Sequence, residues 1–192
     1  MKTHPRLQGV AALLVLLIPR FVPALDLGEV VKGLQVVSVD GRPVSLTPGP
    51  GTHATAVVFL STTCPYANFY SDHLRDLDQK LGPKGLLLVV VNSNRNETVE
   101  EVILQARHHR FAFPVIKDDE DRIADALGAR VTPEAFLLDQ EGRLRYRGRI
   151  RSKQGGTELE DAILDLLAHR PVKTPFAKAF GCAIARVTPS PG

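Results

Sequence analysis

The chain has 192 residues, a length that fits one globular domain. Apolar residues make up 44% and charged residues 23%, proportions that exclude a disordered or low-complexity protein. The formal net charge is +3, but Lys2, Arg6 and Arg20 all precede the first acidic residue, Asp26. Without residues 1–24 the chain carries no net formal charge. We therefore expect neither a nucleic-acid partner nor binding to an anionic membrane surface.

The first 24 residues follow the three-part pattern of a secretory signal. Lys2 and Arg6 make the start positive, Val10–Ile18 is an unbroken apolar run, and Ala24 offers a small residue for cleavage. The apolar run is shorter than the about 20 residues that a membrane-spanning helix needs. We predict export to the periplasm or another extracytoplasmic space, with the membrane contacted only through this signal. An uncleaved anchor, or a helix that packs on the domain, is the alternative.

Short apolar segments then alternate with helical patterns. Ala54–Leu60 is rich in β-branched and aromatic residues and predicts a strand buried on both faces. Pro65–Leu81 repeats its apolar residues at steps of three and four, which predicts an amphipathic helix. A second buried strand is expected at Gly85–Val91. Two short strands, at Leu34–Val39 and Val44–Leu46, are expected before these elements.

The second half of the chain predicts further helices and a β-hairpin. Asp139-Gln140-Glu141-Gly142 separates two strand-like segments and is a strong hairpin signal. The expected elements are a helix at Glu97–Arg110, a short extended piece at Phe113–Ile116, a short helix at Glu120–Leu127, hairpin strands at Glu134–Leu138 and Leu144–Ile150, and a last helix at Thr157–His169.

This order predicts an α/β fold with a central mixed β-sheet. Strands that alternate with helices imply a parallel centre, and the hairpin implies an antiparallel edge. Helices are expected on both faces of the sheet, with an extra helix inserted before the C-terminal hairpin. We divide the chain into the signal (1–24), this domain (25–169) and a C-terminal tail (170–192) that carries the second cysteine.

Cys64 lies where a buried strand is expected to meet the start of a helix. Pro65 suits the first helical position, because its missing N–H would be unpaired there, and Cys64 is then the N-cap residue. The free N–H groups of the first turn favour a negative sulfur, and the thiolate is the nucleophilic form of cysteine. The hydroxyls of Ser61, Thr62 and Thr63 could hydrogen-bond the sulfur or a bound oxidant. A buried, inert cysteine is the alternative.

A second motif, Thr132-Pro133, stands just before a predicted strand. With Cys64-Pro65 and the stretches TTCPYANFY, KGLLLVVVNSN, ALGARVTPEAFLLDQEGRLRYRGRI and KAFGCAI, it makes the chain resemble the thioredoxin superfamily. More closely, the chain resembles the redoxin branch of the alkyl hydroperoxide reductase/thiol-specific antioxidant group. Within that group it is similar to exported peroxiredoxin-like proteins with a CPxx site and a late GCxI segment. The resemblance runs from about Leu34 to Ala185.

The resemblance implies a thioredoxin-like domain in which Pro133 follows a cis peptide bond and lies against the Cys64 sulfur. It also implies that the Thr132 backbone pairs with an extended substrate and that Cys64 is the attacking thiol. The substrate-binding candidates are therefore Ser61, Thr62, Thr63, Pro65, Thr132 and Pro133.

Three features depart from the pattern of these relatives. Ala67 stands where thioredoxins have their second cysteine, so no disulfide can form within the motif. Val57 and Ser61 stand where peroxiredoxins have a proline and a threonine before the attacking cysteine, so only a hydroxyl is kept. Arg151 and Ser152 stand where relatives tend to have a pair of acids after the hairpin strand.

Cys182 is the natural candidate to resolve an intermediate on Cys64. It lies in an apolar segment that could dock, and Gly181 lets the backbone approach closely. Arg186 could raise the local fraction of thiolate. A permanent structural disulfide and a free surface thiol remain as alternatives, because connectivity cannot be read from spacing.

Four arginines alternate along the second hairpin strand and so share one face: Arg145, Arg147, Arg149 and Arg151. We expect them to form a solvated edge that discourages pairing with another strand. Arg149 could instead support a thiolate or a peroxide.

The sequence thus predicts a thiol oxidoreductase without cofactor or bound metal. Cys64 would attack a peroxide, as in peroxiredoxin-like antioxidant activity, or a substrate disulfide. Cys182 or an external thiol would then condense with the product, so the expected partners are the peroxide or disulfide substrate and an external thiol or thioredoxin-like reductant. The alternatives are thiol–disulfide exchange on exported proteins, a non-catalytic module that binds copper or a peptide, and a fold that has lost its activity.

Overall fold

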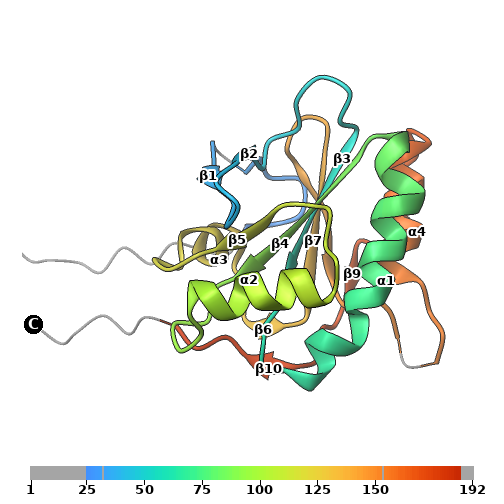
Figure 1. Cartoon of the computed structure of the whole chain (residues 1–192). Helices are drawn as coiled ribbons and strands as arrows, with labels where there is room; N and C mark the ends of the chain where they lie inside the picture. Colours follow the sequence, from blue (N-terminus) through green and yellow to red (C-terminus); the bar gives the residue numbers. More distant parts are fainter. Residues whose placement is uncertain (1–24, 32, 153, 187–192) are drawn as a thin grey trace, which may run out of the picture.

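The computed structural model describes residues 25–31, 33–152 and 154–186. Its centre is a six-stranded sheet in the order β5-β4-β3-β7-β8-β9 (Figure 1). The predicted signal at residues 1–24 lies outside the described residues. Within the described ranges, no helix has both the length and the apolar character that a membrane crossing requires.

The sheet is mixed, as predicted. β3 (Ala54–Phe59) pairs in parallel with β4 (Leu86–Asn92) and antiparallel with β7 (Glu134–Asp139). β5 (Val115–Lys117) extends the parallel side, and β8 (Leu144–Gly148) completes the hairpin with β7. The parallel pairs and the hairpin therefore meet between β3 and β7.

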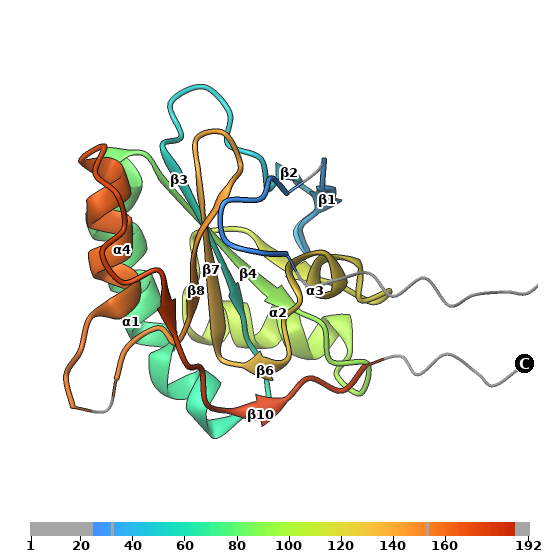
Figure 2. The same ribbon diagram turned by 180° about the vertical axis from the view of Figure 1, so that it is seen from behind.

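Helices cover both faces of this sheet, which confirms the predicted architecture (Figures 1 and 2). Three helices share a core with one face, and a fourth helix with a small hairpin, β1-β2, closes the other. A one-turn 3-10 helix, η1, ends α1. The elements are α1 (Pro65–Leu81), α2 (Val99–His108) and α4 (Glu158–Leu167) on the first face, and α3 (Arg122–Leu127), β1 (Gln35–Val37) and β2 (Pro43–Ser45) on the second, while η1 (Gly82–Lys84) joins α1 to β4.

β3 lies between the two cores and contributes side chains to both. Its side chains alternate between them, as a period of two requires: Ala56 and Val58 lie in the core with α1, and Val57 and Phe59 in the core with α3. All four are fully buried. A slip of one residue would exchange the two sets, so burial fixes the register of β3 and with it the position of the loop that follows.

The prediction that the alternating arginines form a solvated sheet edge is wrong. A short strand, β9 (Phe176–Ala177), pairs in parallel with β8 at Arg147 and Gly148. Gly148 permits this approach, since a Cβ there would lie 1.8 Å from the carbonyl oxygen of Ala177. Carboxylates neutralise three of the arginines through the ion pairs Arg145–Asp139, Arg147–Glu134 and Arg149–Glu158.

Residues 178–186 fold back onto the domain. After β9 the chain forms β10 (Cys182–Ala183), which pairs antiparallel with β6 (Val131–Thr132), and Figure 2 shows the two strands side by side. Ile184, only 7% exposed, inserts into the core on the α3 face. We call residues 178–186 the C-terminal strap, because they lie across the end of the sheet at which β3 finishes.

Candidate active site

Cys64 lies at the junction of β3 and α1. It is the N-cap residue of α1, with φ −79° and ψ 116°, and Pro65 begins the helix, as predicted. The N–H groups of Ala67 and Asn68 donate to the carbonyl oxygen of Cys64 at 3.0 and 3.2 Å. By geometric criteria the Cys64 side chain makes no capping hydrogen bond.

The sulfur of Cys182 lies 2.7 Å from the sulfur of Cys64. Both residues are free thiols, and β10 brings Cys182 into register with Thr132. The Cys64 thiol also donates to the carbonyl oxygen of Thr132 at 3.2 Å. Cys64 is 1% exposed, whereas Cys182 is only partly buried. The strap and Thr132 therefore enclose the first sulfur and leave the second within reach of solvent.

The two thiols have opposite pKa shifts. Burial alone would raise the pKa of Cys64, but hydrogen bonds from the Cys182 side chain and from backbone N–H groups outweigh it and lower that pKa. The hydrogen bond to Cys64 raises the pKa of Cys182 to about 11, helped by burial and by the charges of Cys64 and Glu97. When the pair loses one proton, the negative charge rests on Cys64. Of the two sulfurs, that of Cys64 is therefore the one that ionises first.

A buried carboxylate organises the loop before Cys64. Glu97 is 3% exposed and accepts hydrogen bonds from the Thr62 N–H at 2.7 Å and from the Asn92 amide at 2.6 Å. The hydroxyls of Ser61 and Thr63 also donate to it. Burial favours the neutral acid, but these donors together lower the pKa of Glu97. The charged carboxylate therefore fixes the three residues that lead to the cysteine.

Ser61 connects this carboxylate to the cysteine backbone. Its oxygen accepts the N–H of Cys64 at 3.2 Å while its hydroxyl donates to Glu97. The predicted hydroxyls thus contact Glu97, and their part in substrate binding stays a prediction. Glu97 was not among the predicted site residues. The available signal was its place, shortly after β4 and at the same sheet end as Cys64, where side chains from parallel strands converge.

The second predicted motif also lies at the sulfurs. The Thr132–Pro133 peptide bond is cis, as the resemblance implies. β6 and β10 pair here, so Cys182 occupies the strand position beside Thr132 that an extended substrate was expected to take. The close approach of the strap to β6 depends on Gly181, because a Cβ at that position would lie 1.9 Å from the carbonyl oxygen of Thr132.

Arg149 is bound to a carboxylate. Its Nε donates to Glu158 at 2.9 Å, and its backbone N–H donates to Ala177 at 3.0 Å. Neither cysteine is among the residues that the Arg149 side chain contacts. The side chain lines a cavity together with Pro133 and Gly181. Its support of a thiolate or peroxide stays a prediction.

The sequence matches a family that fits this geometry. The model of the AhpC/TSA family matches residues 27–147, which is more than half of the chain. The chain belongs to this family. Its thioredoxin-like fold agrees with this membership. The family match includes Cys64, Glu97 and Pro133, whereas Cys182 lies beyond it.

Known proteins similar to this AhpC/TSA member include one with a named activity. The chain is 24% identical over 118 residues to the thiol-disulfide oxidoreductase ResA of Halalkalibacterium halodurans, and the match covers 61% of this chain and 65% of ResA, just under two thirds of that relative. The structure of a hypothetical protein from Sinorhizobium meliloti 1021 superposes with a TM-score of 0.78 at 27% identity, covering 87% of this chain and 98% of that one. An uncharacterized conserved protein from Geobacillus kaustophilus gives 0.77 at 25% identity, covering 86% and 94%.

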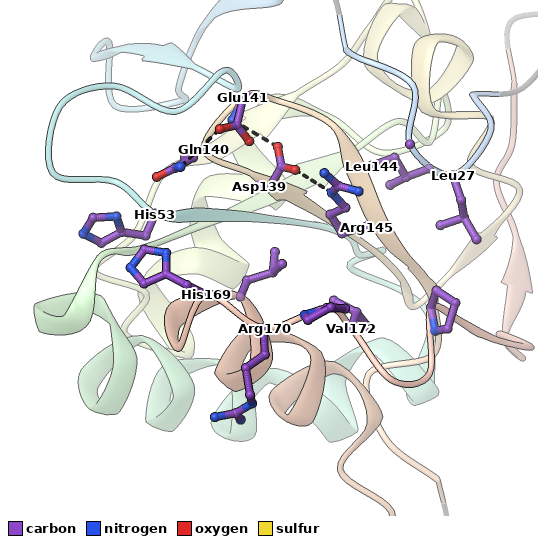
Figure 3. Close-up of a pocket in the computed structure, with 14 residues that line it drawn as sticks. Leu27, His53, Asp139, Gln140, Glu141, Leu144, Arg145, His169, Arg170 and Val172 are labelled. Carbon is purple, nitrogen blue, oxygen red and sulfur yellow. Dashed lines mark hydrogen bonds and ion pairs between the residues drawn. The ribbon is translucent and has the colours of Figure 1, made fainter.

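Another cavity, of about 560 Å³, lies at the opposite end of the sheet (Figure 3). His53 precedes β3 and His169 follows α4, and their rings meet edge to face with centroids 5.9 Å apart. Asp139 and Arg145 form an ion pair at its wall. Because Cys64 follows the other end of β3, this cavity is separate from the sulfurs. In the part of the chain that the structure describes, no group of three or more His, Cys, Asp or Glu side chains could hold a metal ion.

Proposed function

We propose that this AhpC/TSA protein reduces peroxides, with Cys64 as the attacking thiolate and Cys182 as the resolving thiol. The observation that carries the proposal is the 2.7 Å contact between the two sulfurs. Their opposite pKa shifts support these roles, because the thiol with the lowered pKa ionises first and the thiolate is the nucleophile.

The proposed reaction has two steps. The Cys64 thiolate attacks one peroxide oxygen, the S–O bond forms as the O–O bond breaks, and the departing oxygen takes a proton and leaves as water or an alcohol. Cys182 then loses its proton and attacks the sulfenic sulfur, which forms the S–S bond and releases water. The two thiols lose two electrons in total, and the peroxide gains them.

Access to the sulfur favours a small oxidant over a polypeptide. The strap fills the strand position beside Thr132, and Cys64 is 1% exposed. An extended peptide would have to displace the strap before it could pair with Thr132, whereas a hydroperoxide needs to place only one oxygen atom on the sulfur.

One experiment tests this assignment. The reduced protein receives one equivalent of hydrogen peroxide at pH 7 and is followed by mass spectrometry. We expect a Cys64–Cys182 disulfide in the wild type, a sulfenate on Cys64 in Cys182→Ser, and no rapid reaction in Cys64→Ser. Peroxide that leaves Cys64 reduced, or that oxidises Cys182 alone, would contradict the proposal.

Thiol–disulfide exchange is the second candidate, and the similarity to ResA favours it. In that reaction the Cys64 thiolate attacks a substrate disulfide and forms a mixed disulfide, which Cys182 releases by attacking Cys64. Capture of an oxidised peptide on Cys64 in Cys182→Ser, combined with slow reaction with peroxide, would favour exchange over peroxide reduction.

We also propose that residues 1–24 direct export, on the strength of the charged start, the apolar run and Ala24. The protein would then work outside the cytoplasm and meet its substrates and an external thiol reductant there. Fusing these residues to a reporter enzyme that is active only after export tests this, and a reporter that stays inactive would count against export.

A further inference from the structure

A cavity of about 530 Å³ lies beside the chain segments that hold the two sulfurs. Pro133 lines it and directly follows Thr132, whose carbonyl oxygen contacts Cys64. Gly181 lines it too and directly precedes Cys182. Sites for small molecules usually measure about 300–1,000 Å³, so this cavity has room for a compact organic ligand.

The walls of this cavity combine aromatic rings with positive charge. Tyr66 is 48% exposed and Phe180 is 62% exposed. Arg149 and Arg151 also line it, and none of the described residues along its wall is Asp or Glu. Glu158 neutralises Arg149, but across the described residues no carboxylate forms an ion pair with Arg151. The cavity therefore suits a small molecule that carries a negative charge, and a guanidinium binds a carboxylate through two parallel hydrogen bonds.

The two sulfurs differ in how an external molecule can reach them. Cys64 is 1% exposed, whereas Cys182 is only partly buried and adjoins the cavity through Gly181. In thiol–disulfide exchange the attacking sulfur needs access to its target. The difference in exposure selects Cys182 as the atom attacked, and Cys64 is then the leaving group.

We propose that this cavity binds a low-molecular-weight thiol bearing a carboxylate, and that this thiol regenerates the enzyme by attacking Cys182. The inference rests on the proposed function, which supplies the Cys64–Cys182 disulfide. The ligand thiolate forms an S–S bond with Cys182, the Cys64–Cys182 bond breaks, and Cys64 leaves as a thiolate. A second thiolate of the same kind then attacks the mixed disulfide, releases the free ligand disulfide, and leaves Cys182 to take up a proton.

The test starts from the oxidised protein, prepared with diamide, so that a failed peroxide reaction does not affect the result. Reduction is timed with three thiols that differ in charge: mercaptosuccinate, 2-mercaptoethanol and cysteamine, each rate being divided by the thiolate concentration. We expect mercaptosuccinate to be fastest and cysteamine slowest. Arg151→Gln should slow mercaptosuccinate by about fivefold, the effect of a partly exposed ion pair, and leave 2-mercaptoethanol nearly unchanged. Arg122→Gln, an exposed arginine on α3, is the matched control.

The position of attack is read separately. The reaction with mercaptosuccinate is quenched early with an alkylating reagent, and peptide mapping locates the adduct. An adduct on Cys182 with alkylated Cys64 supports the proposal. An adduct on Cys64 would overturn it, as would equal normalised rates for mercaptosuccinate and cysteamine, or equal losses in Arg151→Gln and Arg122→Gln.

Discussion

Replacing Gly181 with alanine tests whether the close docking of the strap brings the two sulfurs together. The new Cβ would lie 1.9 Å from the carbonyl oxygen of Thr132 and 2.6 Å from its carbon, whereas ordinary contacts of a Cβ begin at 3.4 Å. The strap would have to withdraw from β6 by the difference, about 1.5 Å. The obstacle is backbone, which cannot turn aside as a side chain can.

The free energy of strap docking falls by the contribution of the contacts that this withdrawal breaks. It would stretch the hydrogen bond from the Ile184 N–H to Arg130, now 3.0 Å, and the neighbouring β6–β10 pairing beyond hydrogen-bonding distance. Each backbone hydrogen bond contributes about 1 kcal/mol, so two of them give about 2 kcal/mol. That corresponds to about a thirtyfold shift from docked to undocked strap.

The assay measures disulfide formation after one equivalent of peroxide. In Gly181→Ala we expect the Cys64–Cys182 bond to form at least about tenfold more slowly, and trapping of the Cys64 sulfenate by dimedone to increase. Gly49→Ala is the matched control, because a Cβ at Gly49 meets nothing within 4 Å. Disulfide formation in Gly181→Ala at the wild-type rate would refute the argument that strap docking positions Cys182.

Three further substitutions test other parts of the site. Glu97→Gln should lower the free energy of unfolding by about 2–4 kcal/mol at pH 7, because it removes charge-assisted hydrogen bonds, as urea denaturation would measure. The pKa of Glu97 is lowered in the fold, so its charge stabilises the protein fully when the pH is above the ordinary pKa of 4.5. The difference in unfolding free energy between wild type and Glu97→Gln should therefore shrink as the pH falls through the lowered pKa. A difference that stays constant with pH would contradict this. Cys182→Ala should raise the pKa of Cys64, because the hydrogen bond from Cys182 is the strongest of the interactions that lower it. A pH profile of Cys64 alkylation that does not shift would count against that role. Ile184→Ala should weaken strap docking by about 2–4 kcal/mol and increase hydrogen exchange in the strap, whereas equal protection would show that the strap is held elsewhere.

The elements predicted well from sequence are those with long patterns and clear ends. Pro65–Leu81 has its predicted bounds because proline begins it and Gly82-Pro83 ends it. The helix expected at Glu97–Arg110 begins only at Val99, since Thr98 caps it with Glu101 in a capping box while Glu97 turns toward the cysteine loop. β6, β9 and β10 escaped prediction, because strands of two residues have no period and exist only through their pairing partners.

At the site, too, features set by neighbouring residues could be predicted from the sequence, and contacts between distant residues could not. The N-cap position of Cys64 follows from its neighbours in the sequence, and the structure has it there. The contact with Cys182 depends on the path of the strap across the sheet, so the sequence left a redox pair, a permanent bond and a free thiol all open. The interactions of Ser61 and Thr63 with Glu97 cross more than thirty positions of the chain, and only the folded sheet brings these groups together.

Gly148 has an effect far from its own strand. By letting the carbonyl of Ala177 come close, it fixes where β9 sits on β8, and from Ala177 only five further residues lead to Cys182. A tether of that length reaches at most about 17 Å, so its starting point decides where the second sulfur arrives. A substitution of Gly148 would therefore displace the Cys182 sulfur, although Gly148 itself touches neither thiol.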